Sequence, residues 1–457
     1  MRARFAGAGA VLLVACSADA APPAAGSTGD GGTTVAGDTT TGEPTTAAEP
    51  TSSGSTTRVE TSTTAPPDDG TSSSSEGSSS ETTGGRPAGP EVPETAWSDG
   101  LAPERVLGPD LLDLPGGLEG DPLWVSNNPE RVFGAGWLMQ HARVDPQRGG
   151  DALPLERLVA YMFHLNASGA PLRFHLIATN PGEDAISLDA RGSLYDNAQF
   201  PISPGSGPSV AVAEDFLTDA ASIDVQGMVQ PGQGFEVGRI DVAANGILDG
   251  RVTIEATGGL YLYTVATLGG SAEAATNLSQ GGPAPGEILE PGPNAFGRMA
   301  GVYEHSVWAA EVSVEVPAAP AHVGLALNTS DKFQLDGATL QRQTATALVN
   351  LSDSSQESFG NYGMAYDLQL RLCATEDRTV AIRFGSNFVA DQDVPSFTWA
   401  GPMRIVARIV DVLTRPTAPS MEVAERTIDA GTCTDVELDF VVPGLITGGQ
   451  QLVLESR

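Results

Sequence analysis

Lysine is almost absent from this chain, and basic residues are greatly outnumbered by acidic ones. Lys332 is the only lysine, and 24 basic residues face 57 aspartates and glutamates, a formal net charge of −33. Such a surface repels nucleic acid and anionic lipid, so we expect neither as a partner of the folded part. The P-loop, HExxH, GxSxG and calcium-loop patterns are also missing. The sequence therefore predicts no cofactor.

Cysteine is scarce as well. The chain has three, Cys16, Cys373 and Cys433, and no CxxC pair, which excludes zinc and iron–sulfur sites built from several cysteines. If Cys16 is used elsewhere, Cys373 and Cys433 are the only possible pair. Export would place both in an oxidising compartment, which favours a disulfide over two buried free thiols. We predict this disulfide and no metal site.

Long hydrophobic runs are absent after the N-terminus, so no membrane-spanning helix is predicted there. The N-terminus itself has two arginines, a short apolar run over 5–14, and Ala15 before Cys16. This resembles a bacterial lipoprotein signal, in which residues 1–15 are removed and Cys16 receives acyl chains. Each buried methylene contributes about 0.8 kcal/mol, so two or three chains would anchor the protein in a lipid bilayer.

The residue after the cysteine bears on the destination. Ser17 stands where an aspartate would signal retention, which favours the outer membrane, at its periplasmic face or on the cell surface. Between Cys16 and Trp97 there is no aromatic residue, leucine, isoleucine or methionine. Because such a segment cannot form a core, we predict a disordered stalk over 16–95 that separates the folded part from the membrane.

From Trp97 onward, short alternating segments broken by glycine and proline predict strands. We expect 172–177 to form a hairpin with 186–189, and 366–372 to form one with 380–384. Helical periodicity is nearly absent, apart from a short turn over 213–221.

Many short strands at this spacing predict an all-β fold of two tandem β-sandwich domains after the stalk. The first would cover 96–277 and the second 297–457, with a Gly/Pro-rich linker over 278–296.

Two local similarities suggest that the sandwiches are copies of one another. The segment starting at His175 is similar to that starting at Arg371, and the segment starting at Gly234 to that starting at Thr432, at offsets of 196 and 198 residues. Chance similarity between strands is the alternative. Alternation places Cys373 and Cys433 on an outward face. We expect Ile177 and Phe235 to make the corresponding outward contact in the first sandwich.

Four motifs resemble a known family in their order and spacing: Leu114-Pro-Gly-Gly-Leu with Pro122-Leu-Trp-Val-Ser-Asn-Asn-Pro-Glu, Thr179-Asn-Pro, Gly297-Arg-Met-Ala-Gly-Val with Trp308, and Gly360-Asn-Tyr-Gly-Met-Ala-Tyr-Asp-Leu. They are similar to the secreted domain-of-unknown-function family 3370, best known from cyanobacteria, over residues 110–457. The chain departs from it in its long stalk and in lacking a His-His pair near His164. The resemblance implies an exported, mainly β protein and no particular activity.

Two sets of residues are candidates for function. His164 and His175, facing each other across a hairpin with Glu156 nearby, would suit a metal or acid–base cluster. A polar pair on a solvated face is the alternative that we favour. Aromatic and amide side chains that suit sugar binding also occur together, at Trp124, Asn127 and Asn128 and at Asn361 and Tyr362. The alternative for these is a loop closed by an aromatic side chain.

The sequence thus predicts a membrane-anchored exported lipoprotein that acts as a non-catalytic binding or structural module of the cell envelope. Its partners would be polysaccharide, peptidoglycan or an envelope protein. The alternative is an envelope hydrolase or metal-dependent enzyme that uses His164, His175 and Glu156.

Overall fold

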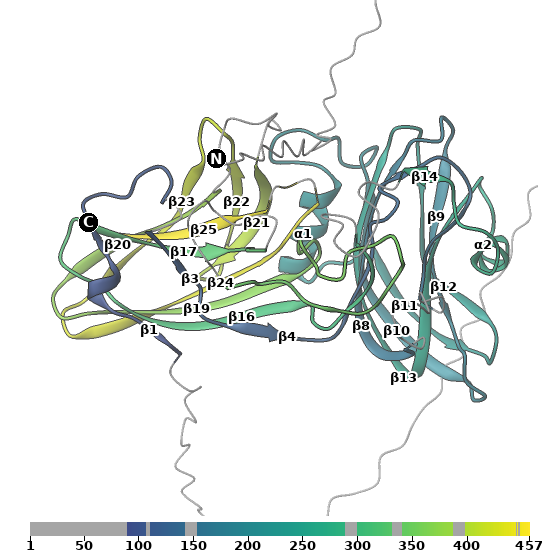
Figure 1. The fold of residues 1–457 in the computed structure, drawn as a ribbon, viewed down its shortest axis with the longest axis horizontal. Coiled ribbons are helices and arrows are strands. Elements are labelled where there is room, and N and C mark those ends of the chain that lie inside the picture. The colour runs from purple at the N-terminus through teal and green to yellow at the C-terminus, as the bar shows by residue number, and fades with distance from the viewer. Residues whose placement is uncertain are drawn as a thin grey trace, which may run out of the picture. The chain divides into compact units, whose positions relative to one another are not determined.

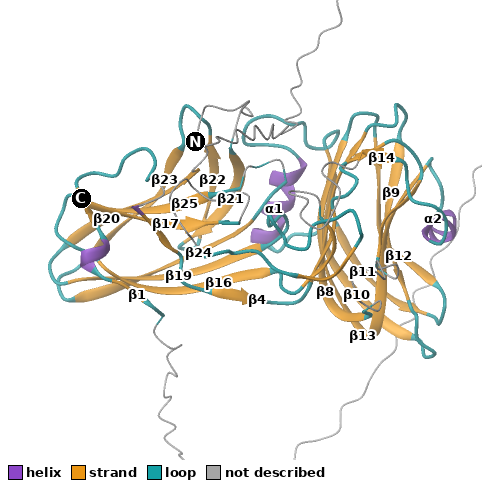
Figure 2. Cartoon of the chain, viewed as in Figure 1, coloured by secondary structure: helices purple, strands orange, loops and turns teal. Residues whose placement is uncertain are grey.

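The computed structural model describes residues 89–106, 110–141, 153–287, 299–330, 341–386 and 398–457, apart from 445 and 447. The predicted signal peptide, Cys16 and nearly all of the predicted stalk lie outside these residues. The chain from Pro87 to Arg457 belongs to one compact unit. Strands make up 57% of the structure and helices 7%, so the all-β prediction is confirmed (Figure 2). No helix in the described ranges is long and apolar enough to cross a membrane.

We call the twelve-stranded sheet the first sandwich, because it forms two layers that share β13 (Ile247–Thr267). One layer has the order β11 (Ile223–Val229), β10 (Ile186–Asp196), β13, β8 (Leu155–Asn166), β5 (Leu123–Ser126), β15 (Ala300–Tyr303) and β18 (Ala347–Asn350). The other contains β12 (Gly234–Val242), β9 (Leu172–Thr179), the end of β13, and β7 (Gly136–Gln140). Beside β8 lies a short pair, β6 (Arg131–Val132) and β14 (Gly286–Glu287).

The strand β13 explains how the two layers are joined. Its residues up to Ala256 pair with β8 and β10, and those from Tyr261 onward pair with β9. Gly258 and Gly259 lie between these two ladders, where the strand passes from one layer to the other. Apolar side chains of both layers, such as Phe174 and Val252, meet in one buried core.

The second sandwich consists of two separate sheets. A seven-stranded sheet has the order β1 (Glu91–Val92), β16 (Val307–Glu315), β19 (Ala365–Ala374), β24 (Thr432–Val441), β21 (Trp399–Ile405) and β22 (Arg408–Thr414), with β4 (Gly117–Glu119) beside β16 (Figure 1). A six-stranded sheet has the order β2 (Ser98–Asp99), β17 (Ala321–Leu327), β25 (Gln450–Ser456), β20 (Arg378–Ser386) and β23 (Ser420–Ile428), with β3 (Leu111–Asp113) beside β17. A single-turn helix over Glu94–Ala96 precedes β2.

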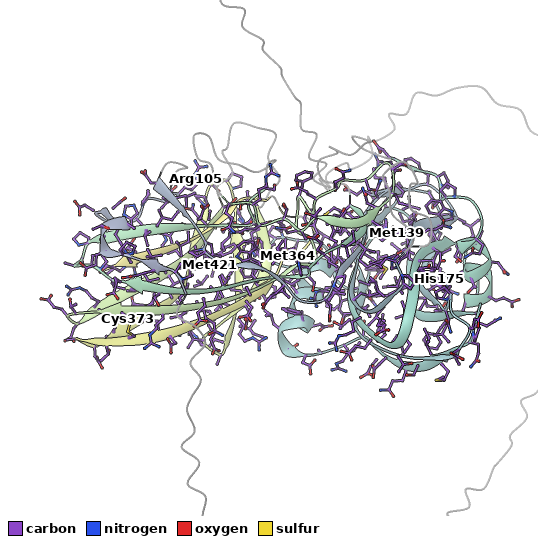
Figure 3. All side chains as sticks on the ribbon, turned by 60° about the horizontal axis from the view of Figure 1, so that its bottom comes forward. Arg105, Met139, His175, Met364, Cys373 and Met421 are labelled. Carbon is purple, nitrogen blue, oxygen red and sulfur yellow. A yellow bond between two sulfur atoms is a disulfide. The ribbon has the colours of Figure 1, made fainter. Side chains whose placement is uncertain are left out.

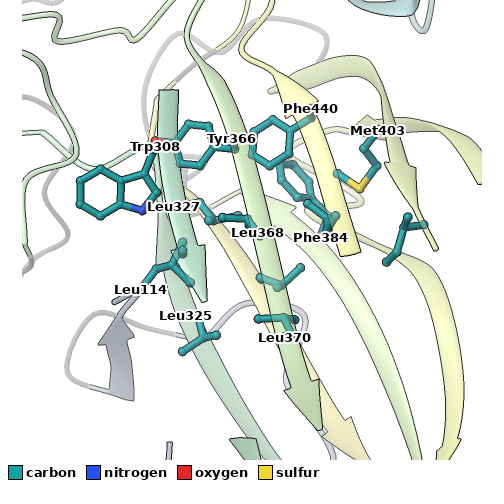
Figure 4. Packing of buried hydrophobic residues seen from close by; sticks show 14 of the residues in the cluster. Leu114, Trp308, Leu325, Leu327, Tyr366, Leu368, Leu370, Phe384, Met403 and Phe440 are labelled. Carbon is teal, nitrogen blue, oxygen red and sulfur yellow. The ribbon is translucent and has the colours of Figure 1, made fainter. Parts of the chain in front are cut away.

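The core of the second sandwich is aromatic at its centre. Tyr366 stacks on Phe440 with ring centroids 4.8 Å apart (Figure 4). The ring of Phe384 packs against Trp399 at a centroid distance of 4.9 Å. These side chains come from strands of both sheets and are fully buried. The alternation of apolar residues along β19 and β16 supplies the rest of this core, as period-two patterning requires.

Strand pairing does not follow the predicted domain limits. The strands β3 and β4 precede the first sandwich in the chain but pair with β17 and β16 of the second. The amide of Ala102 likewise donates to Glu455 Oε2 at 2.8 Å. Conversely, β15 and β18 follow the predicted linker but pair within the first sandwich. Glycine and proline mark where the backbone turns, but they do not determine which sheet the next strand joins. The part of the predicted linker after Glu287 lies outside the described residues.

The two predicted hairpins are wrong, because β9 and β10 lie in opposite layers and so do β19 and β20. The internal similarity nevertheless has a structural counterpart. The order β11, β10, β13, β8 in the first sandwich matches β23, β20, β25, β17 in the second, and β9 pairs with β12 as β19 pairs with β24.

The expected contact between Ile177 and Phe235 is not formed. Phe235 lies opposite Ala178, and Ile177 lies opposite Glu236, so the two apolar side chains point to different faces. Ile177 is buried with Tyr263 under α2 (Ala272–Ser279), while Phe235 packs against the sandwich core.

Candidate ligand cleft beside helix α1

The predicted disulfide is present. Cys373 on β19 and Cys433 on β24 lie directly opposite each other and are bonded, 60 positions apart in the chain. Cys433 is exposed and Cys373 is half-buried, on the outer face of the seven-stranded sheet (Figure 3). Both the pairing and the face therefore agree with the prediction from strand alternation.

His164 is buried inside the first sandwich and bound on both ring nitrogens. Nε2 lies 2.8 Å from Ser126 Oγ, and Nδ1 lies 2.8 Å from the carbonyl oxygen of Pro129. Because a carbonyl only accepts, we infer that Nδ1 carries the proton and that the Ser126 hydroxyl donates to Nε2. Burial lowers the pKa of His164 to about 4, so the ring is neutral at pH 7. Ser126 is equally buried, and the pair holds the segment after β5 against β8.

His175 has different partners, and the predicted cluster is not formed. Its Nδ1 lies 2.6 Å from Glu236 Oε2 and its Nε2 lies 3.0 Å from Thr267 Oγ1. Glu156 is exposed, eight residues before His164 on β8, which is roughly 26 Å along a strand. The two histidines lie in opposite layers of the sandwich. Across the described ranges, no three His, Cys, Asp or Glu residues are grouped to hold a metal ion.

The residues predicted to bind sugar near β5 are closed off from solvent. Trp124 is fully buried, and Asn127 and Asn128 are 3% and 1% exposed. The Asn128 side-chain amide donates to the carbonyl of Asp353 at 3.2 Å and to Ser354 Oγ at 3.1 Å. These side chains therefore form part of the interior rather than a sugar-stacking surface. The sequence pattern did not distinguish the two because β15, which pairs with β5, and the loop after β18, which binds Asn128, come from far along the chain.

Asn361 is also buried, in a network of neutral hydrogen bonds. Its side-chain amide donates to Asn328 Oδ1 at 2.9 Å and to the carbonyl of Gln343 at 2.8 Å, and its Oδ1 accepts from Ser358 Oγ at 2.7 Å. Its φ of 51° lies in the left-handed region, which asparagine tolerates. Tyr362 is half-buried and donates to the carbonyl of Ile446 at 3.2 Å. The arrangement orders a loop and leaves Asn361 out of reach of a ligand.

A solvent-open cleft of about 420 Å³ lies between α1 (Pro208–Thr218) and the outer face of β10 and β13. Pro208 occupies the first position of α1, where its missing amide costs nothing, and Asp219 ends the helix in the left-handed conformation. The helix contacts β10 and β13 on one side and β21 and β24 on the other (Figure 1). Polar residues that alternate with core residues on β10 and β13 form the floor.

Most charges of the cleft are bound by neighbouring side chains. The Arg191 guanidinium lies 2.6 Å from Asp224 Oδ2 and 3.4 Å from Asp219 Oδ1. Glu255 is bound by Arg157 at 2.9 Å. Asp215 of α1 accepts hydrogen bonds from the hydroxyls of Ser193 and Tyr195, which fasten the helix to β10. Asp189 accepts from the Gln226 side-chain amide at 2.7 Å.

Arg251 is held at the floor of the cleft without a carboxylate. Its Nε donates to the carbonyl of Gly363 at 3.0 Å, and its guanidinium carbon lies 4.6 Å from the centroid of the Phe216 ring. Its Nη atoms have no hydrogen-bond partner among the described residues, and neither is fully buried. Burial lowers the pKa of Arg251 to about 10, so it remains charged at pH 7. The cleft therefore presents an unpaired guanidinium beside an aromatic ring.

Asp249 is the buried neighbour of this site, two residues before Arg251 on β13. Its Oδ2 accepts from the hydroxyls of Ser209, at the start of α1, and of Tyr161 on β8, the latter at 3.3 Å. Burial raises the pKa of Asp249 to about 7, and these hydrogen bonds oppose the shift. Asp249 thus ties the helix to the sheet and gains a proton close to neutral pH.

A family described as "Protein of unknown function (DUF3370)" matches residues 275–456. Residues 275–456 resemble this family. The resemblance expected from the sequence is confirmed there, and it takes in the motifs starting at Gly297 and Gly360. The motifs starting at Leu114 and Thr179 lie before the match. All side chains that line the cleft also lie before the DUF3370-like region, which contributes the carbonyl of Gly363.

No match was found among curated proteins. One similar solved structure is the crystal structure of tripeptidyl peptidase 2, at 9% identity and a TM-score of 0.18, covering 72% of this chain and 24% of that one. Another is the CBM22-1-CBM22-2 tandem domain of Paenibacillus barcinonensis Xyn10C, at 8% identity and a TM-score of 0.14, covering 75% and 92%. This chain thus spans about a quarter of the peptidase's length. At these scores neither similarity supports a conclusion about this chain.

Sequence reasoning missed the cleft although it identified its parts. The segment starting at Arg251 was expected to be a strand, and its alternation already places Arg251, Thr253 and Glu255 on the polar face. The helical segment expected over 213–221 is α1, which begins at Pro208 and ends at Thr218. What was missing was the pairing of β10 with β13, which brings Ser193 opposite Arg251. The DUF3370 resemblance could not have identified the cleft, because the side chains that line it lie before residue 275.

Proposed function

We propose that this chain is an exported, lipid-anchored protein of the bacterial cell envelope that binds or supports a partner without catalysing a reaction on it. The observation that carries this proposal is the disulfide between Cys373 and Cys433. Disulfides persist in oxidising compartments and are rare in the cytosol. A disulfide on the outer face of a sheet therefore supports export, which the resemblance of the N-terminus to a lipoprotein signal ending at Cys16 also predicts.

A binding role without catalysis is supported by the state of the histidines. His164 and His175 are each bound to separate partners, and Glu156 is far from both, so the alternative enzyme loses the cluster on which it was based. The partners that we propose are polysaccharide, peptidoglycan or an envelope protein. The cleft beside α1 is the open, polar site of the described residues that suits such a partner.

The anchor is tested by labelling cells with radioactive palmitate and separating their membranes. The full chain is expected to carry the label and to sediment with the outer membrane, and Cys16→Ser is expected to lose both properties. Cys373→Ser is the matched control, because it removes a cysteine that is not acylated and keeps the label. A wild-type chain that is unlabelled and remains in the soluble fraction would contradict the proposal.

The binding role is tested with the purified full chain in detergent on an array of bacterial glycans. Binding of a defined polysaccharide would identify the partner class directly. A blank array would favour a peptide or protein partner. Protease treatment of intact cells then distinguishes the cell surface, where the folded part is digested, from the periplasmic face, where it is protected.

A further inference from the structure

The cleft beside α1 has one guanidinium and two carboxylates without an oppositely charged partner among the described residues, and the second carboxylate, Asp215, is already occupied by two hydroxyl donors. Arg251 lines the cleft, forms no ion pair within the described ranges, and its Nη atoms have no hydrogen-bond partner there. Asp189 accepts only from the neutral amide of Gln226 among those residues. Arg191 and Glu255, in contrast, are already paired with charged side chains. A ligand can therefore gain two new charge-assisted contacts, one of each sign.

The guanidinium is prepared for a carboxylate. The Gly363 carbonyl fixes Nε, and the ring of Phe216 lies against the guanidinium plane, so both restrict the side chain before a ligand arrives. An arginine held in this way binds a carboxylate with two parallel hydrogen bonds, and little side-chain freedom remains to be lost.

The rest of the cleft selects against a simple anion. Asp189, Asp215 and Glu255 line it, and all three would repel a ligand that carried only negative charge. A purely cationic ligand would instead face the unpaired Arg251. Asp189 lies directly opposite Glu255 in the strand register, so two carboxylates stand side by side where an ammonium group could bind. The charge pattern fits a zwitterion.

The spacing sets the length of that zwitterion. Arg251 and Glu255 are four residues apart on β13, which is about 13 Å along a strand. An extended peptide of three or four residues spans about 10–14 Å. The cleft volume of about 420 Å³ falls within the usual range for small-molecule sites.

We propose that this cleft binds a short zwitterionic peptide, with its terminal carboxylate on Arg251 and its ammonium group beside Asp189 and Glu255. This rests on the proposed binding role but not on the membrane anchor. Thr253, which lies between Arg251 and Glu255 on the same face of β13, places its side-chain hydroxyl under the central part of such a peptide.

The test uses the purified full chain in detergent and measures binding of tri-alanine by saturation-transfer NMR and calorimetry. Tri-alanine is expected to bind at millimolar concentration or below. N-acetyl-tri-alanine, which lacks the ammonium group, and tri-alanine amide, which lacks the carboxylate, are each expected to bind roughly tenfold more weakly or worse. Free alanine is too short to reach both charges and is expected to bind no better than the blocked peptides.

Two variants locate the peptide. Asp189→Asn should weaken tri-alanine about tenfold and leave N-acetyl-tri-alanine unchanged, because it removes the partner of the ammonium group. Arg251→Lys keeps the charge but loses the planar fork, so it should weaken every probe that carries a carboxylate. Asp411→Asn, at an exposed position of β22, is the matched control and should bind as wild type.

The proposal is overturned if tri-alanine fails to bind, if the blocked peptides bind as tightly, or if Asp411→Asn has the same effect as Asp189→Asn. The three probes on the wild-type chain decide the matter even if Arg251→Lys does not fold. The two proposals can fail separately. A chain that does not bind tri-alanine can still be lipid-anchored, and a chain that is not lipid-anchored can still bind tri-alanine.

Discussion

Two antiparallel strand pairs occupy corresponding places in the two sandwiches, and their outer faces are stabilised by different means. Over β9 and β12, helix α2 buries Ile177, and His175 is bound to Glu236. Over β19 and β24, the face is open and the disulfide joins Cys373 to Cys433. The difference shows that one strand arrangement can be secured either by burying apolar surface or by a covalent bond across the strands.

The interiors differ in a parallel way. The first sandwich buries groups that titrate, namely His141, His164 and Asp249. The second buries a neutral network around Asn361 and Tyr366, and its buried carboxylate, Glu455, has a pKa held below 4.5 by hydrogen bonds and by Arg457. We therefore expect acid above about pH 4.5 to act on the first sandwich and reductant to act on the second.

The largest change in the free energy of unfolding should be seen when the pH of the Asp249→Asn variant is lowered. His141 and His164 have a folded pKa of about 4 and an unfolded value of 6.5, so the unfolded chain binds more protons and stability falls as pH drops through this window. Asp249, raised to about 7, acts in the opposite direction. Between pH 6.5 and 4, each histidine lowers the free energy of unfolding by about 3 kcal/mol, and Asp249 raises it by about 3 kcal/mol. From these three groups, wild type should lose about 3 kcal/mol of stability and Asp249→Asn about 6 kcal/mol.

Urea unfolding of both proteins at several pH values measures this difference. Asp411→Asn, which removes an exposed carboxylate, should follow wild type. A pH dependence of Asp249→Asn no steeper than that of wild type would show that Asp249 does not oppose the histidines.

The second largest effect should come from removing the disulfide, which should lower the free energy of unfolding by about 4 kcal/mol. The reason is that its loss releases a loop of 60 residues in the unfolded chain. Cys433→Ser and the double variant with Cys373→Ser should lose the same amount, measured by urea unfolding. Hydrogen exchange should quicken in β19 and β24 but not in β9 and β12. Equal quickening in both pairs would mean that the two sandwiches do not respond independently.

Ile177→Ala removes the apolar contact under α2 that takes the place of the disulfide on β9 and β12. The cavity under α2 should cost about 3 kcal/mol in urea unfolding, within the range for buried isoleucine. Exchange should quicken in α2 and β9, the reverse of the disulfide pattern. Val410→Ala on β22, which is only partly buried, is the control and should cost much less.

Ser126→Ala should have the smallest effect, about 2 kcal/mol, because it leaves Nε2 of the buried His164 without a donor. The loss of stability should be greatest where the folded ring is neutral, well above the folded pKa of about 4. Ser203→Ala, in an exposed turn, is the matched control. A variant as stable as wild type would mean that this hydrogen bond contributes nothing net.

Local pattern was enough to predict the strand class, the disulfide and its outward face, because alternation is a property of consecutive residues. It failed for the hairpins, since the turn after Thr179 carries the chain into the opposite layer rather than back along β9. Trp124 and Asn361 have the composition of sugar-binding residues, but segments distant in the chain bury them. Arg251 could be assigned to a polar face, whereas its lack of a carboxylate partner depends on β10 and α1.

The pairing of β3 and β4 with strands some 200 residues later constrains the order in which the protein can fold. A chain made from its N-terminus has these early segments available long before β16 and β17 exist. They must stay unpaired until β16 and β17 are made, after every strand of the first sandwich except β18, and the contact of Ala102 with Glu455 forms only when the last few residues are made. This early segment has six leucines between residues 98 and 119, and the acidic residues and prolines between them are the kind of residues that keep an unpaired apolar segment from aggregating during this interval.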